Sequence, residues 1–232
     1  MSRVPLILCP GLLNDAALWA HQTAYLSDLA EPRVADLTAA DSIPELADRV
    51  LASAPDRFAL AGLSMGGYVA FEIMRKAPQR VARLALVNTS ARADTEESRD
   101  RRMQLMEIAR RGGFSKLPLQ ILAGQMHPDN FANEALRGIC LGMAERVGAG
   151  GFIRQQTAIM GRPDNRPGLT AIACPTIVVG GAQDGLTTPE IMGEIAAGIP
   201  GAGFTLIERA GHLTPIEQPV AVTALLRLWL RG

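Results

Sequence analysis

The chain lacks the features by which many proteins bind nucleic acid. Its 23 basic and 23 acidic residues give a formal net charge of zero, whereas a nucleic-acid-binding protein usually carries a basic excess or a basic stripe. Aromatic residues make up only 4% of the 232 residues, so we expect no surface on which unpaired bases stack. The sequence therefore predicts no nucleic-acid partner.

Cysteines are also few. The three cysteines, Cys9, Cys140 and Cys174, form an odd set with no pair at C-x-x-C spacing. This argues against a disulfide framework and favours a reducing compartment. Apolar residues flank each cysteine, so we expect three small buried side chains rather than functional thiols.

Long apolar runs are missing as well. No stretch of about 18 consecutive apolar residues is present, so we expect neither a membrane-spanning helix nor a membrane partner. The first residues combine one arginine with a short apolar stretch, as a signal peptide does. Pro10 and Gly11 interrupt that stretch, and no clear small-x-small cleavage site follows. We therefore expect these residues to belong to the mature fold of a cytoplasmic protein.

The composition is that of a globular protein, with 48% apolar and 20% charged residues. Short apolar runs alternate with amphipathic helical patterns, and continuous runs of this kind are typical of a parallel sheet that is covered on both faces. The predicted fold class is therefore α/β, with helices on both faces of a mostly parallel central sheet. We expect about six strands, at residues 4–9, 33–37, 58–63, 84–87, 176–179 and 204–207.

The alternation is interrupted once, by 81 residues between Ser90 and Ile172 that show helical patterns only. We therefore predict a core domain over residues 1–90 and 172–232 and a helical cap over residues 91–171. A helix over residues 131–147 should bury Ile139. Five of the nine methionines lie in this insertion, where they either fill the space between helices or form an adjustable lining for an apolar substrate.

The strongest chemical signal is the sequence G-L-S-M-G-G at residues 62–67. A buried strand is predicted before it and a helix after it, which is the context of a nucleophile elbow. Small residues are needed at Gly62 and Gly66 because Ser64 would occupy a strained turn above the carboxyl end of the sheet. The alternative interpretation is a glycine-rich turn without chemistry.

A serine nucleophile needs a base, and the chain has only three histidines. His212 follows the last predicted strand, at the sheet edge where open α/β folds bind their ligands, and is the predicted base. His21 lies on a surface-like helix. His127 precedes a proline in the insertion, where it is either a solvated loop residue or a substrate contact.

The base in turn needs a carboxylate that holds its tautomer. Asp184 follows a predicted strand and gives the chain order Ser, Asp, His. Asp164 and Asp94 are alternatives, but neither follows a predicted strand of the sheet.

Two backbone N–H groups are expected to form an oxyanion hole. One belongs to Met65, the residue after the nucleophile. The other belongs to Leu12, because Gly11 allows a tight turn after the first strand that exposes this N–H. The alternatives are an ordinary glycine turn at this place and a donor in the side chain of Asn14.

At these residues the chain resembles an α/β-hydrolase over nearly its whole length. GLSMGG matches the family's elbow, GGAQDGLTTP its acid turn and AGHLTPIEQP its histidine loop. The resemblance implies that Ser64 is the nucleophile, Asp184 the acid and His212 the base, with the N–H groups of Leu12 and Met65 as oxyanion donors.

The resemblance also identifies the insertion with the family's helical cap, and small capped esterases and enol-lactonases are the most similar members. Two departures stand out. PGLL occupies the place of a common His-Gly pair, with Cys9 and Pro10 before Gly11. The strand before this turn begins so early that there is no room for the family's N-terminal antiparallel strand pair, which we expect to be absent.

We therefore expect a serine hydrolase that cleaves a small carboxylic ester or lactone without a metal or an organic cofactor. Thioester or C–C bond hydrolysis, perhydrolysis, and a ligand receptor on a hydrolase scaffold remain alternatives. The protein is expected to be a monomer or a homodimer. The candidate substrate-binding residues are Leu13, Met103, Met106, His127, Leu186 and Leu213.

Overall fold

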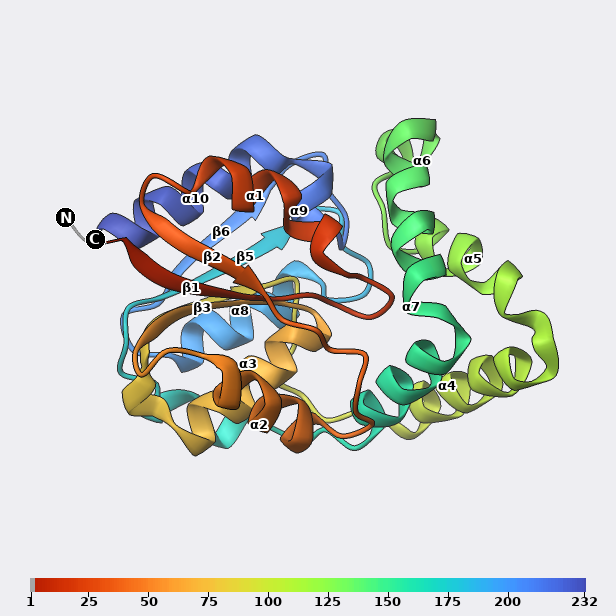
Figure 1. Cartoon of the computed structure of the whole chain (residues 1–232), viewed down its shortest axis with the longest axis horizontal. Coiled ribbons are helices and arrows are strands. Elements are labelled where there is room, and N and C mark those ends of the chain that lie inside the picture. The colour runs from red at the N-terminus through yellow and green to blue at the C-terminus, as the bar shows by residue number, and fades with distance from the viewer. Residues whose placement is uncertain (1–2) are drawn as a thin grey trace.

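A computed structural model describes residues 3–232 and places a six-stranded sheet at the centre of the molecule (Figure 1). The strand order is β2-β1-β3-β4-β5-β6, and within the described residues every pairing is parallel. This confirms the predicted fold class. The strands are β1 (Val4–Cys9), β2 (Ala30–Val34), β3 (Phe58–Leu63), β4 (Val81–Val87), β5 (Thr176–Gly181) and β6 (Gly203–Ile207).

Helices cover both faces of the sheet (Figure 1). One face packs against α2 (Ile43–Ser53), α3 (Met65–Lys76) and α8 (Pro189–Gly198), and the other against α1 (Ala20–Tyr25), α9 (Thr214–Glu217) and α10 (Pro219–Arg231). Among residues 3–232, no helix combines the length and the apolar character that crossing a bilayer requires.

Strand β1 illustrates why the strands of this sheet are continuous apolar runs. Successive side chains of a strand point to opposite faces. Ile7 and Cys9 belong to the core beneath α2 and α3, whereas Leu6 and Leu8 belong to the core on the α10 side. Because both faces are buried, neither set of positions is polar.

Strand β2 lies at residues 30–34 rather than at the predicted 33–37. It is an edge strand that pairs only with β1, so its sequence, with Glu31, Pro32 and Arg33, carries little apolar pattern. Proline is tolerated at such an edge. The predicted segment 33–37 therefore covers the end of the strand and the residues that follow it.

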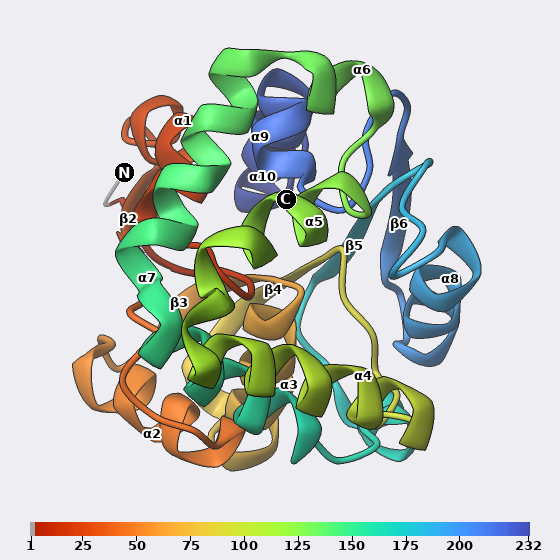
Figure 2. The ribbon, with the colours of Figure 1, turned by 90° about the vertical axis from the view of Figure 1, so that its right-hand side faces the viewer.

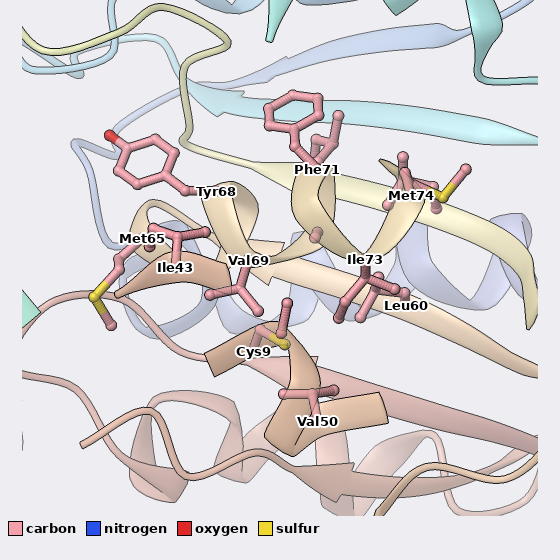
Figure 3. Close-up of a cluster of buried hydrophobic side chains, with 14 of the residues drawn as sticks. Cys9, Ile43, Val50, Leu60, Met65, Tyr68, Val69, Phe71, Ile73 and Met74 are labelled. Carbon is pink, nitrogen blue, oxygen red and sulfur yellow. The ribbon is translucent and has the colours of Figure 1, made fainter. Parts of the chain in front are cut away.

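Helix α3 packs directly on the strand that precedes it. Figure 3 shows Val69 and Ile73 pointing from α3 toward Cys9 of β1 and Leu60 of β3, with Val50 of α2 beside them. All five side chains are buried. The N-terminus of α3 is thereby held at the carboxyl end of β3.

The insertion between β4 and β5 forms α4 (Glu96–Ile108), α5 (Leu117–Ala123), α6 (Pro128–Ala132) and α7 (Glu134–Met160). These helices lie together on one side of the sheet, to the right in Figure 1 and facing the viewer in Figure 2. The site described below lies between them and the carboxyl ends of the strands.

Helix α7 begins at Glu134 and runs to Met160, beyond the end of the helix predicted over residues 131–147. Its 27 residues continue through a kink at Gly148, whose φ of 67° suits glycine. Ile139 is 48% exposed, so the prediction that it is buried is wrong. The buried stripe of α7 is centred on Cys140 and Met143, and Ile139 lies at its edge.

Two helical glycines provide a test of how closely β1 and α3 approach. A methyl group at Gly66 of α3 would overlap the backbone carbonyl of Cys9, whereas one at Gly138 of α7 would meet no atom within 4 Å. We expect Gly66→Ala to lower the free energy of unfolding by about 1–3 kcal/mol. Gly138→Ala should raise it by up to about 1 kcal/mol, because alanine favours a helix over glycine. Urea denaturation of both variants measures this, and equal stabilities would contradict the described packing.

Candidate active site

Ser64 occupies the sharp turn between β3 and α3. Its φ of 54° and ψ of −114° lie outside the regions that L-residues favour, and such a backbone costs on the order of 1–3 kcal/mol. Four hydrogen bonds stabilise the turn. The Ser64 N–H donates to the Val87 carbonyl (3.0 Å), and the Ser64 carbonyl accepts from the Thr89 hydroxyl (2.8 Å) and from the N–H groups of Gly67 (2.9 Å) and Tyr68 (3.3 Å). The strain is thus held by the neighbouring strand β4.

The glycines of the motif are required by close backbone contacts. A side chain at Gly62 would overlap the backbone of Gly66, and one at Gly66 would overlap the end of β1. Any larger residue would separate the strand from the helix that follows it.

The turn after β1 lies against Ser64. A Cβ atom at Gly11 would be 3.3 Å from the Cβ of Ser64. The next N–H groups differ in their partners. The Leu13 N–H donates to the Gln155 side chain at 3.0 Å, whereas the N–H groups of Leu12 and Met65 have no acceptor among residues 3–232. Two unpaired donors therefore lie beside Ser64.

Asp184 and His212 are in direct contact. Asp184 follows β5 and His212 follows β6, so the parallel sheet brings them to the same edge. The Nδ1 atom of His212 lies 2.8 Å from Oδ2 of Asp184, and both side chains are buried. A carboxylate accepts hydrogen bonds, so Nδ1 carries the proton and Nε2 keeps its lone pair. His212 Nε2 is buried and has no hydrogen-bond partner in the described part of the chain.

The carboxylate of Asp184 accepts four further hydrogen bonds. Oδ2 accepts from the Asn88 amide (2.8 Å) and the Thr187 hydroxyl (2.6 Å). Oδ1 accepts from the backbone N–H groups of Leu186 (2.8 Å) and Thr187 (3.0 Å). Burial alone would raise the pKa of Asp184, but attraction to His212 and the hydrogen bonds outweigh it and hold this pKa well below its usual range.

Asn88 is a site residue that sequence reasoning missed. It is fully buried with a φ of 42°, and besides Asp184 its amide contacts the Gly211 carbonyl (3.1 Å) and the Thr214 hydroxyl (2.6 Å). Its position could have indicated this role, because Asn88 directly follows β4 just as Asp184 and His212 follow β5 and β6. Thr187, likewise missed, lies 3.3 Å from His212 Nδ1.

Glu217 is a second buried carboxylate that the sequence did not reveal. Its Oε1 accepts from the N–H groups of Gly211 and Leu213, both at 3.0 Å and on either side of His212. Its Oε2 accepts from the His127 N–H (2.8 Å) and the Asn130 amide (2.9 Å) of the insertion. Glu217 thus holds the histidine loop and the insertion together.

Ser64 lines a cavity of about 190 Å³ between the sheet edge and the insertion. A larger cavity of about 460 Å³ adjoins it and shares Leu12, Arg102 and Leu186. The two cavities also share Ser98 and Gln125, and the remaining lining of the Ser64 cavity includes Tyr68, Ser90, Arg92, Asp94, Thr95, Ile159, Arg162, Thr187 and Ile191.

Three candidate substrate-binding residues do line cavities. Leu186 lines both cavities just described, while Leu13 and Leu213 line a small neighbouring one of about 20 Å³.

The structure places the other three candidates away from the lining of the Ser64 cavity. Met103 is 48% exposed and Met106 is buried beside Thr157. His127 is the residue before α6 and caps it, with its Nδ1 accepting from the Asp129 N–H at 3.2 Å. Helix α4 turns Arg102 and Leu105 toward the cavities, so the two methionines one position further on fall on other faces.

The alternative acids are engaged elsewhere. Asp164 forms an ion pair with Arg166 at 2.6 Å, and Asp94 forms ion pairs with Arg102 and Arg162. Within residues 3–232, no three histidine, cysteine or acidic side chains are grouped as metal ligands would be.

Comparisons with known proteins match the chain to one family and to several hydrolases. A family model described as "Alpha/beta hydrolase family" matches residues 6–225. The structure of an esterase from Thermogutta terrifontis with malate bound is 31% identical with a TM-score of 0.91, covering 99% of this chain and 90% of that one. The enol-lactonase of Burkholderia xenovorans LB400 is 26% identical with a TM-score of 0.91, covering 100% and 93%. A pimeloyl-acyl-carrier protein methyl ester esterase of Edwardsiella ictaluri is 26% identical, covering 95% and 91%.

The lowered pKa of Asp184 predicts how stability depends on pH. A carboxylate whose pKa is lower in the folded state stabilises the protein above its unfolded pKa of about 3.9, and this contribution is lost as the pH falls toward the folded pKa. At pH 7 we expect wild type to exceed Asp184→Asn in free energy of unfolding by on the order of 2 kcal/mol. The difference should shrink between about pH 4 and pH 2. Denaturant titrations across this pH range measure it, and a constant difference would contradict the assignment.

Proposed function

The chain belongs to the alpha/beta hydrolase family, and on this premise we propose that it is a serine hydrolase that cleaves a small carboxylic ester or lactone. The observation that carries the proposal is the buried His212, with one ring nitrogen on Asp184 and the other unpaired, at the same sheet edge as the strained Ser64. Such a histidine is equipped to accept a proton.

In the proposed reaction, the Ser64 Oγ attacks the carbonyl carbon while His212 Nε2 takes its proton. Asp184 holds the tautomer and stabilises the imidazolium that forms. Because the pKa of Asp184 is well below its usual range, this residue remains a carboxylate throughout the cycle. His212 then protonates the leaving alcohol, and the acyl group stays on Ser64.

The oxyanion of the tetrahedral intermediate would be stabilised by the N–H groups of Leu12 and Met65. Both are free of internal acceptors in the described residues, so neither has to give up a bond when the negative charge develops. Water activated by His212 would then release the acid. The helices of residues 91–171 would act as the cap that covers this chemistry and contributes to the substrate cavity.

The named relatives support the bond type. One structural neighbour is an esterase, another an enol-lactonase, and a curated relative is a methyl ester esterase. All three break a carboxylic ester or lactone bond, which is the chemistry proposed here. A panel of p-nitrophenyl esters, lactones and acyl thioesters would identify the preferred acyl compound.

The role of Ser64 is tested with a fluorophosphonate probe and ester substrates. Ser64→Ala should lower ester turnover at least ~10³-fold without loss of the fold, because binding and the oxyanion donors leave only residual catalysis. The probe should label wild type at Ser64, as located by peptide mass spectrometry. Ser90→Ala is the matched control, since Ser90 lines the same cavity, and it should keep the labelling. Labelling at another residue, or none, would overturn the proposal.

The oxyanion donor at Leu12 is tested by separating its backbone from its side chain. Leu12→Ala keeps the N–H and should retain most of the turnover. Leu12→Pro removes the N–H and should lower kcat by ~10²–10³-fold. Circular dichroism and fluorophosphonate labelling of Ser64 check that the proline variant is folded. A folded Leu12→Pro protein with near wild-type turnover would place the donor elsewhere, with the Asn14 side chain as the first alternative.

A further inference from the structure

The Ser64 cavity has an unusual charge pattern. Arg92, Arg102 and Arg162 line it, together with a single acidic residue, Asp94. No charged group is required for binding a neutral ester, and burying guanidinium groups without equal negative charge is unfavourable.

Asp94 is shared between two of these arginines. Its Oδ2 lies 2.9 Å from Arg102 Nε and its Oδ1 lies 2.8 Å from Arg162 Nη1. The Asp94 side chain is only 2% exposed, so water screens these charges little. One carboxylate thus faces two guanidinium groups.

The surrounding ion pairs do not restore the balance. Glu194 contacts Arg92 at 2.8 Å and Arg166 at 3.5 Å, and Arg166 also pairs with Asp164. The group around Asp94 has two arginines and one carboxylate, and the neighbouring group has two arginines and two carboxylates. One positive charge remains, and among the lining residues only arginines supply it.

Arg102 is the arginine that presents this charge to the cavity. Its Nε is bonded to Asp94 and its Nη1 to Gln156 Oε1 at 2.7 Å, which leaves Nη2 without an acceptor in the described residues. It lines both the Ser64 cavity and the larger adjoining one. Its side chain is 18% exposed, so a small ligand can reach it while the guanidinium stays in place.

Arg162 is less available. Its side chain is 7% exposed, it donates to the carbonyls of Arg92 and Ile159, and it lies 4.6 Å over the ring of Tyr68. These contacts fix the guanidinium of Arg162 in place, where it pairs with Asp94. Arg92 is paired with Glu194, and its side chain is 47% exposed.

We propose that the substrate carries a carboxylate in addition to its ester or lactone group, and that Arg102 binds this carboxylate while Ser64 attacks the carbonyl. This rests on the function proposed above and narrows the substrate to esters of small dicarboxylic acids or lactones that bear an acid group. A guanidinium held by two side chains recognises a carboxylate with little loss of conformational entropy. The small volume of the cavity keeps the two ends of such a substrate a few bonds apart.

The first test compares two esters that differ only in charge at one end. Monomethyl succinate carries a carboxylate where methyl butyrate carries a methyl group. Wild type should prefer monomethyl succinate by at least ~10-fold in kcat/KM, because a charge-assisted hydrogen bond is worth that much. Arg102→Gln should bring this preference close to one, mainly through KM, and Arg102→Lys should restore part of it. Added salt should weaken the preference.

Arg99→Gln is the matched control, because Arg99 lies on the same helix, is exposed and does not line the Ser64 cavity. It removes the same charge from α4 and should leave the wild-type preference intact. Wild type without a preference, or a preference that survives Arg102→Gln, would overturn the proposal while leaving the hydrolase function standing.

A second measurement does not depend on turnover. Succinate, at matched ionic strength, should slow fluorophosphonate labelling of Ser64 in wild type, succinamide should not, and Arg102→Gln should lose the protection. Equal effects of succinate and succinamide would count against the carboxylate site. Failure of the probe to label Ser64 at all would instead overturn the serine-hydrolase function, and with it the substrate assignment that rests on it.

Discussion

The carboxylate of Asp184 is the point on which the geometry of the site depends. Its five hydrogen bonds come from Asn88 after β4, from Leu186 and Thr187 after β5, and from His212 after β6. Three loops of the sheet edge are therefore positioned by one buried charge. A buried carboxylate is tolerated when hydrogen-bond donors replace the water that it has lost. The attraction to His212 and these hydrogen bonds hold the pKa of Asp184 below its usual range despite its burial.

Glu217 plays the corresponding part for the backbone around His212. It binds the N–H groups on both sides of the histidine and, with its other oxygen, two donors from the insertion. The His212 N–H itself donates to the Gln125 carbonyl of the insertion at 2.6 Å. The histidine loop is thus bonded both to Glu217 of the sheet domain and to the insertion. A displacement of the insertion would therefore also displace His212.

The sequence was most informative where physical constraints are local. Strands β1 and β3 were predicted to the residue, because both faces of each are buried and the apolar run ends where the strand ends. Ser64, Asp184 and His212 were singled out because each follows a predicted strand, and a parallel sheet brings such positions to one edge. The prediction for the edge strand β2 was displaced by three residues at each end of the strand. Because this strand is partly exposed to solvent, its pattern of apolar residues is weak.

The sequence was least informative about the insertion. Helix α4 is charged around most of its circumference, so its pattern predicts a helix but not which side faces the cavity. Met103 and Met106 were chosen for their chemistry, whereas Arg102 and Leu105 line the cavities. Asn88 and Glu217 were missed because their partners lie far away in sequence: Asn88 bonds to Asp184, 96 residues on, and Glu217 to His127, 90 residues back.

The arginine group around Asp94 connects the insertion to the proposed chemistry. Asp94 lies where the chain leaves the sheet and Arg162 where it turns back, so their ion pair closes the insertion at its base. Arg102 extends the same pair to the wall of the Ser64 cavity. The charges that would hold an anionic substrate are therefore the charges that hold the insertion over Ser64. A carboxylate bound at Arg102 would supply the negative charge that this group lacks, so the proposed substrate would complete the ion pairing of Asp94, Arg102 and Arg162.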